Sequence, residues 1–592
     1  MERPDWPPHE GLRTIEQIEA QPLKHWLRGH TVPEVIAAAA QNYGEAVAHR
    51  FLSTPDAEPI DTTFNDLQSL SEVAASPFAS LGPSPVVASL LPALPATLPL
   101  AFGAMQAGIY MPINPMLTPD AIGQMLARAQ ADVLLCPSDI DADRIDQISQ
   151  HRPELAVTKV PDIKLEVGSV FAGWGLSGGA PKAPMPKDVA AYVHTGGTTG
   201  APKIARLSHA NLAFMAFLAA FGGGMREGDV MPCGMPLFHV GGLVFGGLAP
   251  IAAGGRIVQL GKDGFRDPAM RSALPAVANR EAATLLFAPP TIAIDVLGTT
   301  EPNPFASARH WVSSAAPLPK ATHEAFTRHT GLQVKEAWGM TEATLVLSFM
   351  PPGGETRVGS VGQRLPFCEL CIVDQQTKNL LPSGQTGLIL ARSPGVFAGY
   401  VGADDDGLVE GPDGQRWLDT GDLGTFDEDG FLTITGRAKD MILRGGHNID
   451  PGIIEAAYLA HPDVSAAIAV GKPDARVGEV PIVFLTGLPG VSLDADAICA
   501  EVNPAISDPV ARPRDVVVLA TLPLTTVGKP DKPALRREAT RIAVAQIVET
   551  ATSIDVKAGE GGALRVALHP LTHSDASQVR SLGLDVEEAE IV

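Results

Sequence analysis

Cysteine is scarce in this 592-residue sequence: the five cysteines are too few for a disulfide framework in a chain of this length. Basic residues are also outnumbered, because 44 lysines and arginines stand against 66 aspartates and glutamates, giving a net charge of −22. Such an acidic balance argues against non-specific binding to nucleic acid and against docking on anionic membranes. We therefore expect no nucleic-acid partner.

Long uninterrupted hydrophobic runs are absent as well. The longest apolar run, VVASLLPALPATLPLAFGAM from Val86, contains three prolines and predicts a buried strand and helix instead of a membrane span. The first residues, MERPDWPPHEG, contain no basic stretch leading into an apolar core, so no signal peptide is expected. These features together predict a cytoplasmic protein.

One C-x-x-C pair, Cys368 and Cys371, requires an explanation. It lies in PFCELCIVD, which alternates like a strand, and residues three apart on a strand point to opposite faces. Neither a redox nor a metal role is therefore predicted for this pair.

The pattern of apolar runs predicts an α/β fold. A chain of this length exceeds a single core, and short apolar runs alternate with helical patterns over most of it, which favours layered α/β architecture with largely parallel sheets. We predict a large N-terminal domain with a β-rich subdomain near its end (residues 1–437), a small α+β domain (438–544) and an extension (545–592). Within the extension, IDVKAGEGGALRVAL predicts a hairpin and SDASQVRSLG a short helix.

The stretch YVHTGGTTGAPK at residues 192–203 indicates a phosphate loop. Its glycines allow the backbone to approach a ligand, its threonines bring hydroxyls, and Lys203 brings a positive charge. No lysine directly follows Gly200, so it is not a Walker A motif, and by itself the stretch leaves a flexible surface loop open.

Four further stretches follow in a fixed order, and together with the loop they resemble the adenylate-forming superfamily. This superfamily contains acyl-CoA synthetases, luciferases and peptide-synthetase adenylation domains. The resemblance covers roughly residues 30–540, and the four stretches are EAWGMTEAT (336–344), WLDTGDLGTFDEDGFLTITGR (417–437), KDMILRGGHNIDPGIIE (439–455) and PLTTVGKPDKPAL (523–535).

The resemblance implies an ATP-dependent carboxylic acid–CoA ligase that forms an acyl-adenylate with Mg²⁺ and then transfers the acyl group to coenzyme A. Its partners would be a small carboxylic acid and CoA. The implied nucleotide- and CoA-binding residues are Thr195, Gly196, Gly197, Thr198, Thr199, Gly200, Lys203, Ala315, Ala316, Pro317, Trp338, Asp422, Arg437, Lys439, Gly445 and Gly446.

Individual roles also come from the resemblance. Asp422 would accept hydrogen bonds from the ribose hydroxyls, and Trp338, where tyrosine is common, would stack near adenine. Lys439 would be the hinge on which the small domain rotates, bringing the Gly445–Gly446 turn to line a pantetheine tunnel. The stretch SSAAPLP (313–319), which contains the adenine-site candidates Ala315, Ala316 and Pro317, differs from the family's usual sequence, which is glycine-rich before Ala-Pro-Leu.

Four residues are implied to be catalytic. Lys529 would bridge the substrate carboxylate and the α-phosphate, Thr341 would hold that phosphate, and Glu342 would bind Mg²⁺. His239, in PLFHVGGL, would shutter the carboxylate site.

The acyl group is expected to be fatty, alicyclic or aryl. The residues expected to line its pocket carry no charge: Val240, Gly241, Gly242, Phe287, Ala288 and Ala337.

Other functions stay open at this stage. Within the superfamily, the acyl acceptor could be a carrier protein, or the protein could bind adenylates without chemistry. The Gly-x-Ser-x-Gly of residues 175–179 fits a hydrolase elbow but precedes a proline-rich loop. In HPLTH (569–573), Pro570 disfavours a helical metal site.

Overall fold

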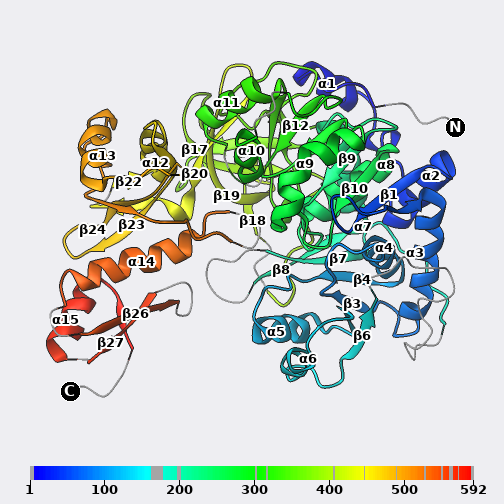
Figure 1. The fold of residues 1–592 in the computed structure, drawn as a ribbon, viewed down its shortest axis with the longest axis horizontal. Coiled ribbons are helices and arrows are strands. Elements are labelled where there is room, and N and C mark those ends of the chain that lie inside the picture. Colours follow the sequence, from blue (N-terminus) through cyan, green and yellow to red (C-terminus); the bar gives the residue numbers. More distant parts are fainter. Residues whose placement is uncertain are drawn as a thin grey trace.

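The computed structural model describes residues 6–161, 178–195, 202–299, 303–314, 316, 318–403, 407–445, 447–488, 490–525, 529–548, 551–558, 564–570 and 572–587. They form a large lobe with the N-terminal part of the chain and a small lobe with the C-terminal part (Figure 1). Layered sheets and helices build the large lobe, as the sequence predicts.

A nine-stranded sheet forms one layer of the large lobe. Its neighbouring strands pair in parallel from β1 across to β13, and antiparallel strands close both edges. In spatial order the strands are β15 (Gln363–Arg364), β14 (Ser348–Phe349), β13 (Gln333–Trp338), β12 (His310–Ser313), β11 (Leu285–Phe287), β9 (Val230–Cys233), β10 (Arg256–Leu260), β1 (Val47–Leu52) and β2 (Ile60–Thr63).

A six-stranded sheet forms the second layer, and only its edge strand β8 runs antiparallel to its neighbour. In spatial order its strands are β6 (Ala156–Val160), β5 (Val133–Pro137), β3 (Val86–Ser89), β4 (Ile109–Pro112), β7 (Val189–His194) and β8 (Ile204–Ser208). The predicted largely parallel sheets are confirmed.

One hydrophobic core joins the two sheets through helices, and α7 (His209–Gly222) is buried along almost its whole length. A helix that is apolar all round suits such a central position. The other helices contributing to this core include α2 (Val32–Tyr43), α3 (Phe64–Ala79), α4 (Thr97–Ala107), α8 (Ala249–Ala253) and the π-helix η2 (Gly241–Leu248). Further helices of the lobe are α1 (Leu12–Glu19), η1 (Leu23–His25), α5 (Pro119–Ala129), α6 (Ala142–Ser149), η3 (Gly264–Arg266), α9 (Pro268–Arg280), α10 (Pro290–Leu297), α11 (Lys320–Thr330) and the 3-10 helix η4 (Thr341–Ala343).

The apolar run from Val86 becomes β3 and α4, the strand and helix that its prolines predict. No helix among the described residues is long and apolar enough to cross a membrane.

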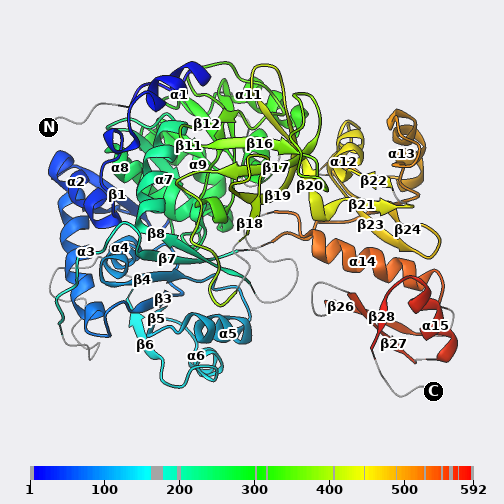
Figure 2. The same ribbon diagram turned by 180° about the vertical axis from the view of Figure 1, so that it is seen from behind.

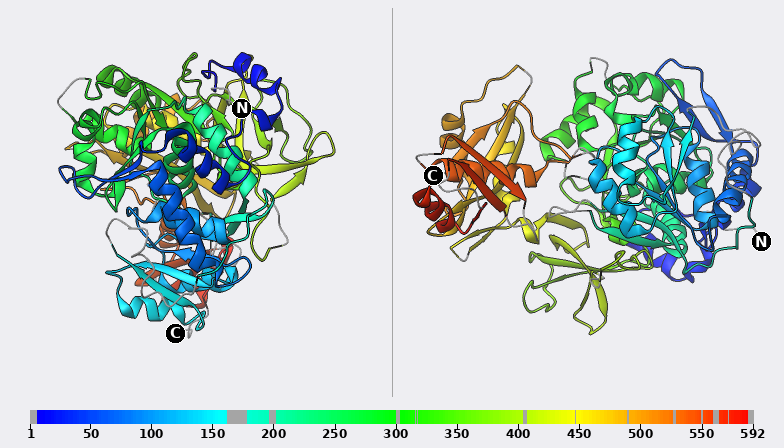
Figure 3. Two further views of the ribbon diagram at one scale, coloured as in Figure 1. Left: turned by 90° about the vertical axis from the view of Figure 1, so that its right-hand side faces the viewer. Right: turned by 90° about the horizontal axis from the view of Figure 1, so that it is seen from below.

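The predicted β-rich subdomain is an antiparallel sheet, whose strands project to one side of the two lobes in the right-hand view of Figure 3. Its strands are β16 (Glu369–Val373), β17 (Gly387–Arg392), β19 (Arg416–Phe426), β18 (Leu408–Glu410) and β20 (Leu432–Arg437). Cys368 packs into the main core, whereas Cys371 packs against a separate cluster on the other face of this sheet, as the strand pattern predicts.

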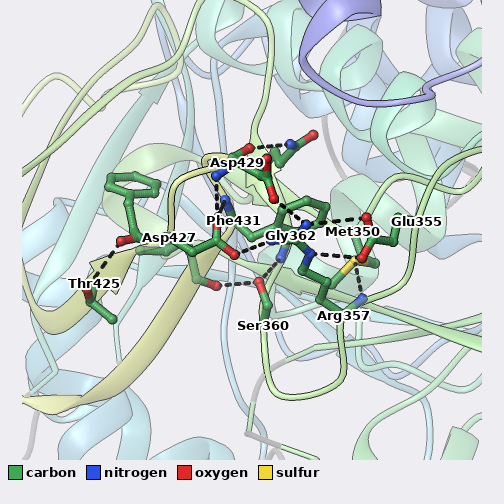
Figure 4. A network of polar contacts seen from close by, with 12 residues as sticks. Met350, Glu355, Arg357, Ser360, Gly362, Thr425, Asp427, Asp429 and Phe431 are labelled. Carbon is green, nitrogen blue, oxygen red and sulfur yellow. Dashed lines mark hydrogen bonds and ion pairs between the residues drawn. The ribbon is translucent and has the colours of Figure 1, made fainter. Parts of the chain in front are cut away.

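The turn between β19 and β20 is fixed to the large sheet by one arginine (Figure 4). The Arg357 guanidinium binds Asp427 and Asp429 of the turn, each at 2.5 Å, and lies 4.2 Å from the centre of the Phe431 ring. The Ser360 hydroxyl adds a hydrogen bond to the Leu432 carbonyl at 2.7 Å. These contacts fix the position of the β19–β20 hairpin relative to the edge of the large sheet.

The small lobe is built on a five-stranded mixed sheet. Its strands are β22 (His447–Ile449), β21 (Ile442–Arg444), β24 (Gly478–Gly487), β23 (Val464–Asp474) and β25 (Asp515–Val518), and its helices are η5 (Ala438–Asp440), α12 (Pro451–Leu459), α13 (Ala495–Val502), η6 (Asn503–Ala505) and α14 (Lys532–Ala545).

The extension forms the predicted hairpin and helix, as β26 (Ser553–Ala558), β27 (Leu564–His569), α15 (His573–Ser581) and the short strand β28 (Asp585–Val586). Its core includes Val544 of α14. Figures 1 and 2 both show α14 between the small lobe's sheet and the extension. The domain boundaries at 437/438 and 544/545 remain predictions, and the second falls inside α14.

We predict that Leu568→Ala unfolds the extension locally. Leu568 is 1% exposed, so the substitution leaves a cavity and removes about 3 kcal/mol of local stability. Hydrogen exchange would show lost protection in β26 and β27 while β13 keeps its protection. Arg565→Ala, on the exposed face of the same strand, is the matched control. Equal protection in both variants would contradict the assignment of this core.

Candidate active site

The glycine-rich stretch joins β7 to β8 as a hairpin connection at the edge of the six-stranded sheet. The Thr195 amide donates a hydrogen bond to the Lys203 carbonyl at 2.8 Å, which holds the two ends of the connection side by side. The residues between them that the sequence predicts to bind phosphate lie outside the described residues: Gly196, Gly197, Thr198, Thr199 and Gly200.

The carboxyl ends of parallel strands in the large sheet, together with the start of η2, carry the residues expected to line the acyl pocket. Phe287 ends β11, Ala288 follows it, and Ala337 is the penultimate residue of β13. Ligands of open α/β sheets bind at this edge. Val240, Gly241 and Gly242 enter from the start of η2, and the described side chains of this set are all buried.

A sharp turn after β13 presents Thr341 and Glu342. A Cβ on Gly339 would lie 1.8 Å from the Leu345 carbonyl oxygen, so this turn requires glycine. Both residues then lie in η4, where Glu342 is buried. The Tyr400 hydroxyl donates a 2.7 Å hydrogen bond to Glu342 Oε1. Sequence reasoning missed Tyr400, because the residues around it match none of the five motifs.

Asp422 is held at both carboxylate oxygens. It is buried on β19 opposite Arg437 of β20, whose Nε lies 2.9 Å from Oδ1. The Trp338 indole N–H, at the end of β13, donates a 2.8 Å hydrogen bond to Oδ2. The structure therefore brings together Trp338, Asp422 and Arg437, with a direct hydrogen bond between the first two. Each oxygen keeps further lone-pair capacity for a ligand.

Lys529 of the small lobe is close enough to this group for their charges to interact. Thr525 and Lys529 hydrogen-bond to each other through the Thr525 amide (2.6 Å) and the Lys529 amide (3.1 Å). Burial lowers the pKa of Lys529, the positive charge of Arg437 lowers it further, and the charge of Asp422 opposes the change. The lysine ammonium is thus within electrostatic reach of the Asp422–Arg437 pair.

His239 is also close enough to Lys529 for the lysine charge to act on it. Burial lowers the pKa of His239 to about 3, and the nearby charges of Lys529 and His194 contribute. The Gly241 amide donates to His239 Nδ1 at 3.0 Å, which leaves the proton of the neutral ring on Nε2.

His194 was not singled out from the sequence, where a lone histidine carries no signal. The Asn114 amide donates to its Nε2 at 3.1 Å, and its ring centre lies 6.1 Å from that of Phe238. Burial lowers its pKa to about 4, so the two neighbouring histidines are both neutral at pH 7.

The expected hinge, Lys439, is close to the same charged pair, because after burial the charge of Arg437 lowers its pKa further and the charge of Asp422 opposes the change. Lys439 is in η5, where burial lowers its pKa and its carbonyl accepts a 3.1 Å hydrogen bond from Arg536 of α14. Gly445 has a φ of 57° and donates its amide to the Val477 carbonyl within the small lobe. Gly446 lies outside the described residues.

Three further predicted features are the adenine-site candidates before α11, the hydrolase-like Gly-x-Ser-x-Gly and the two histidines of HPLTH. Ala316 is half-buried, while Ala315, Pro317 and residues 175–177 of the hydrolase-like motif lie outside the described residues. His569 is exposed at the end of β27 and His573 begins α15.

Comparison with known proteins identifies the family. The model of the AMP-binding enzyme family matches residues 36–401, and that of the AMP-binding enzyme C-terminal domain matches residues 453–529. The chain is 31% identical over 567 residues to marinolic acid–CoA ligase of Pseudoalteromonas sp., covering 90% of this chain and 85% of that one. It is 30% identical to sulfoacetate–CoA ligase of Cupriavidus necator, covering 76% and 87% of the two chains.

A solved structure agrees. ATP-bound MatB from Rhodopseudomonas palustris superimposes with a TM-score of 0.77 at 25% identity, covering 87% of this chain and all of that one. The chain belongs to the AMP-binding enzyme family, the adenylate-forming superfamily, and within it to the acyl-CoA synthetase branch.

Proposed function

We propose that this protein is an ATP-dependent carboxylic acid–CoA ligase in which the carboxylate first attacks the α-phosphorus of ATP. That step forms acyl-AMP and releases pyrophosphate; the CoA thiol then forms acyl-CoA and releases AMP. The observation that carries the proposal is the position of Lys529, which the small lobe holds within electrostatic reach of the Asp422–Arg437 pair and of His239.

Charge explains why this arrangement suits the first step. Joining a carboxylate to a polyphosphate brings two anions together, so the transition state requires cationic groups placed in advance. Lys203 and the loop around it would hold the β- and γ-phosphates, and Lys529 would lie between the carboxylate and the α-phosphate. Thr341 would donate to the α-phosphate. Asp422 would accept the ribose hydroxyls, since it has lone pairs left beside Trp338 and Arg437.

Magnesium fits the donor set at Glu342. No group of three or more histidine, cysteine or acidic side chains that could hold a metal is found in the described part of the chain. Mg²⁺ commonly binds through one or two carboxylates, waters and substrate phosphates, so the single buried carboxylate of Glu342, linked through Tyr400 to Lys203, would be a suitable ligand. When bound, the ion would neutralise charge on the phosphate oxygens.

The second step would follow rotation of the small lobe about Lys439. The Gly445–Gly446 turn would then approach the adenylate, because a turn without side chains leaves room for the pantetheine arm. His239, neutral at pH 7, would swing away from the carboxylate entrance as a shutter.

We propose a fatty, alicyclic or aryl acid as the substrate. The described residues expected at the acyl end are buried and apolar, and an apolar pocket recognises such groups. A fatty acid would place the enzyme in fatty acid metabolism. We also propose a cytoplasmic location, consistent with scarce cysteine and with ATP and CoA as co-substrates.

The direct test is release of pyrophosphate and AMP from the purified protein with Mg·ATP and a panel of acids, with and without CoA. We predict AMP formation that requires both an acid and CoA for turnover. Turnover independent of CoA would indicate another acceptor, such as a carrier protein. ATP binding without turnover on fatty, aryl or alicyclic acids would contradict the proposed function.

Trp338→Phe should weaken ATP binding roughly tenfold, because it removes a hydrogen bond to a charged group worth about 1.5 kcal/mol. Isothermal titration calorimetry would measure the change. Trp417→Phe is the matched control, since Trp417 makes a 2.8 Å bond to Asp413 on the same subdomain. Equal ATP affinity in the two variants would refute the role given to Asp422.

Lys529→Ala should lower acid-dependent AMP formation roughly 100-fold or more while ATP still binds. In the unchanged enzyme the pKa of Lys529 is lowered, so its charge is lost as the pH rises through a value below the ordinary 10.5. The rate should therefore fall on the alkaline side below pH 10.5. Lys532→Ala, which removes only a 3.0 Å ion pair to Glu455, should retain both rate and profile. A Lys529→Ala enzyme with an unaltered rate would disprove the assignment.

A further inference from the structure

Tyr400 lies on a segment that extends the six-stranded sheet beside the phosphate loop. Residues 398–401 run antiparallel to β8, the strand that leaves the loop, and Tyr400 lies opposite Ala205. Three backbone hydrogen bonds fix this pairing: Ala398 N–H to the Arg206 carbonyl (2.9 Å), Arg206 N–H to Gly399 (3.0 Å) and Val401 N–H to Ile204 (2.9 Å). The position of Tyr400 is therefore set relative to Lys203, which directly precedes β8.

The same segment also holds the turn that carries Glu342. The Phe397 amide donates to the Glu342 carbonyl at 2.9 Å, and the Thr344 hydroxyl donates to the Gly395 carbonyl at 2.6 Å. Two separate parts of the site, the exit of the phosphate loop and the η4 turn, are thus attached to one stretch of backbone.

The Tyr400 side chain connects these two parts directly. Its hydroxyl donates to Glu342 Oε1 at 2.7 Å, and the Lys203 ammonium lies 4.5 Å from the centre of its ring. Tyr400 and Glu342 are both 8% exposed. A buried hydroxyl on one carboxylate oxygen restricts the carboxylate to one orientation, and the ring face attracts the lysine charge.

We infer that Tyr400 is a positioning residue for Mg·ATP: it orients the Glu342 carboxylate through its hydroxyl and the Lys203 ammonium through its ring. One side chain would then set the relative positions of the carboxylate that binds Mg²⁺ and the ammonium that binds the phosphates. The inference rests on the proposed function, because it takes Glu342 and Lys203 to bind the metal and the phosphates.

Tyr400→Phe isolates the hydroxyl, since the ring beside Lys203 remains. The measurement is ATP binding by calorimetry in the absence of any acid, so that no turnover occurs, at a series of Mg²⁺ concentrations. We expect the Mg²⁺ concentration that gives half the full effect on ATP affinity to rise roughly tenfold, as for other partners of metal ligands. Metal-free ATP affinity should change less than twofold.

Tyr458→Phe is the matched control. It also removes one tyrosine hydrogen bond, the 3.1 Å contact to Asn503 in the small lobe. Tyr400→Leu removes hydroxyl and ring together, and should weaken metal-free ATP binding about threefold, because Lys203 loses its aromatic neighbour.

Two results would overturn the inference, and they are distinguishable. If the unchanged protein binds Mg·ATP and Tyr400→Phe has the same Mg²⁺ dependence as Tyr458→Phe, Tyr400 only packs against Phe397 and the inference is wrong. If the unchanged protein does not bind Mg·ATP at all, the proposed function itself fails, and this inference with it.

Discussion

The Asp422 carboxylate is the contact on which the arrangement of the site depends. It accepts a hydrogen bond from the Trp338 indole N–H of the large sheet, pairs with Arg437 of its own hairpin, and lies within electrostatic reach of the Lys529 ammonium of the small lobe. Three parts of the chain that are distant in sequence therefore meet at one buried negative charge. Arg437 pairs with this carboxylate while Lys529 and Lys439 lie within its electrostatic reach, which leaves positive charge available for an anionic ligand.

The fold makes this meeting possible through rigid supports. Parallel strands bring their carboxyl ends to one edge, where β13 delivers Trp338 and the Gly339 turn delivers Glu342. Arg357 fixes the far end of the β19–β20 hairpin to the large sheet, so the position of Asp422 does not depend on a free loop. The small lobe supplies Lys529, whose charge lies within reach of this pair.

Ordered motifs allowed the family and the fold class to be predicted, because each motif ties a residue type to a turn or strand end. The roles of the site residues remain predictions. The hairpin of the extension was also predictable, since a glycine-rich turn separates two alternating strands. Side-chain contacts over long separations were not. The Trp338–Asp422 bond spans 84 residues and the Tyr400–Glu342 bond spans 58, and no local pattern encodes either. His194 was missed for the same reason: only burial beside Phe238 and His239 distinguishes it.

The most direct test of the central claim, that Lys529 and the Asp422–Arg437 pair assemble a site for making an acyl-adenylate, is isotope exchange. Labelled pyrophosphate would be incubated with the enzyme, Mg·ATP and an acid that supports AMP formation, with CoA left out. Reversible adenylate formation predicts that label enters ATP only when the acid is present. Failure of label to enter ATP with such an acid, under conditions where ATP binds, would contradict an acyl-adenylate intermediate and the account built on it.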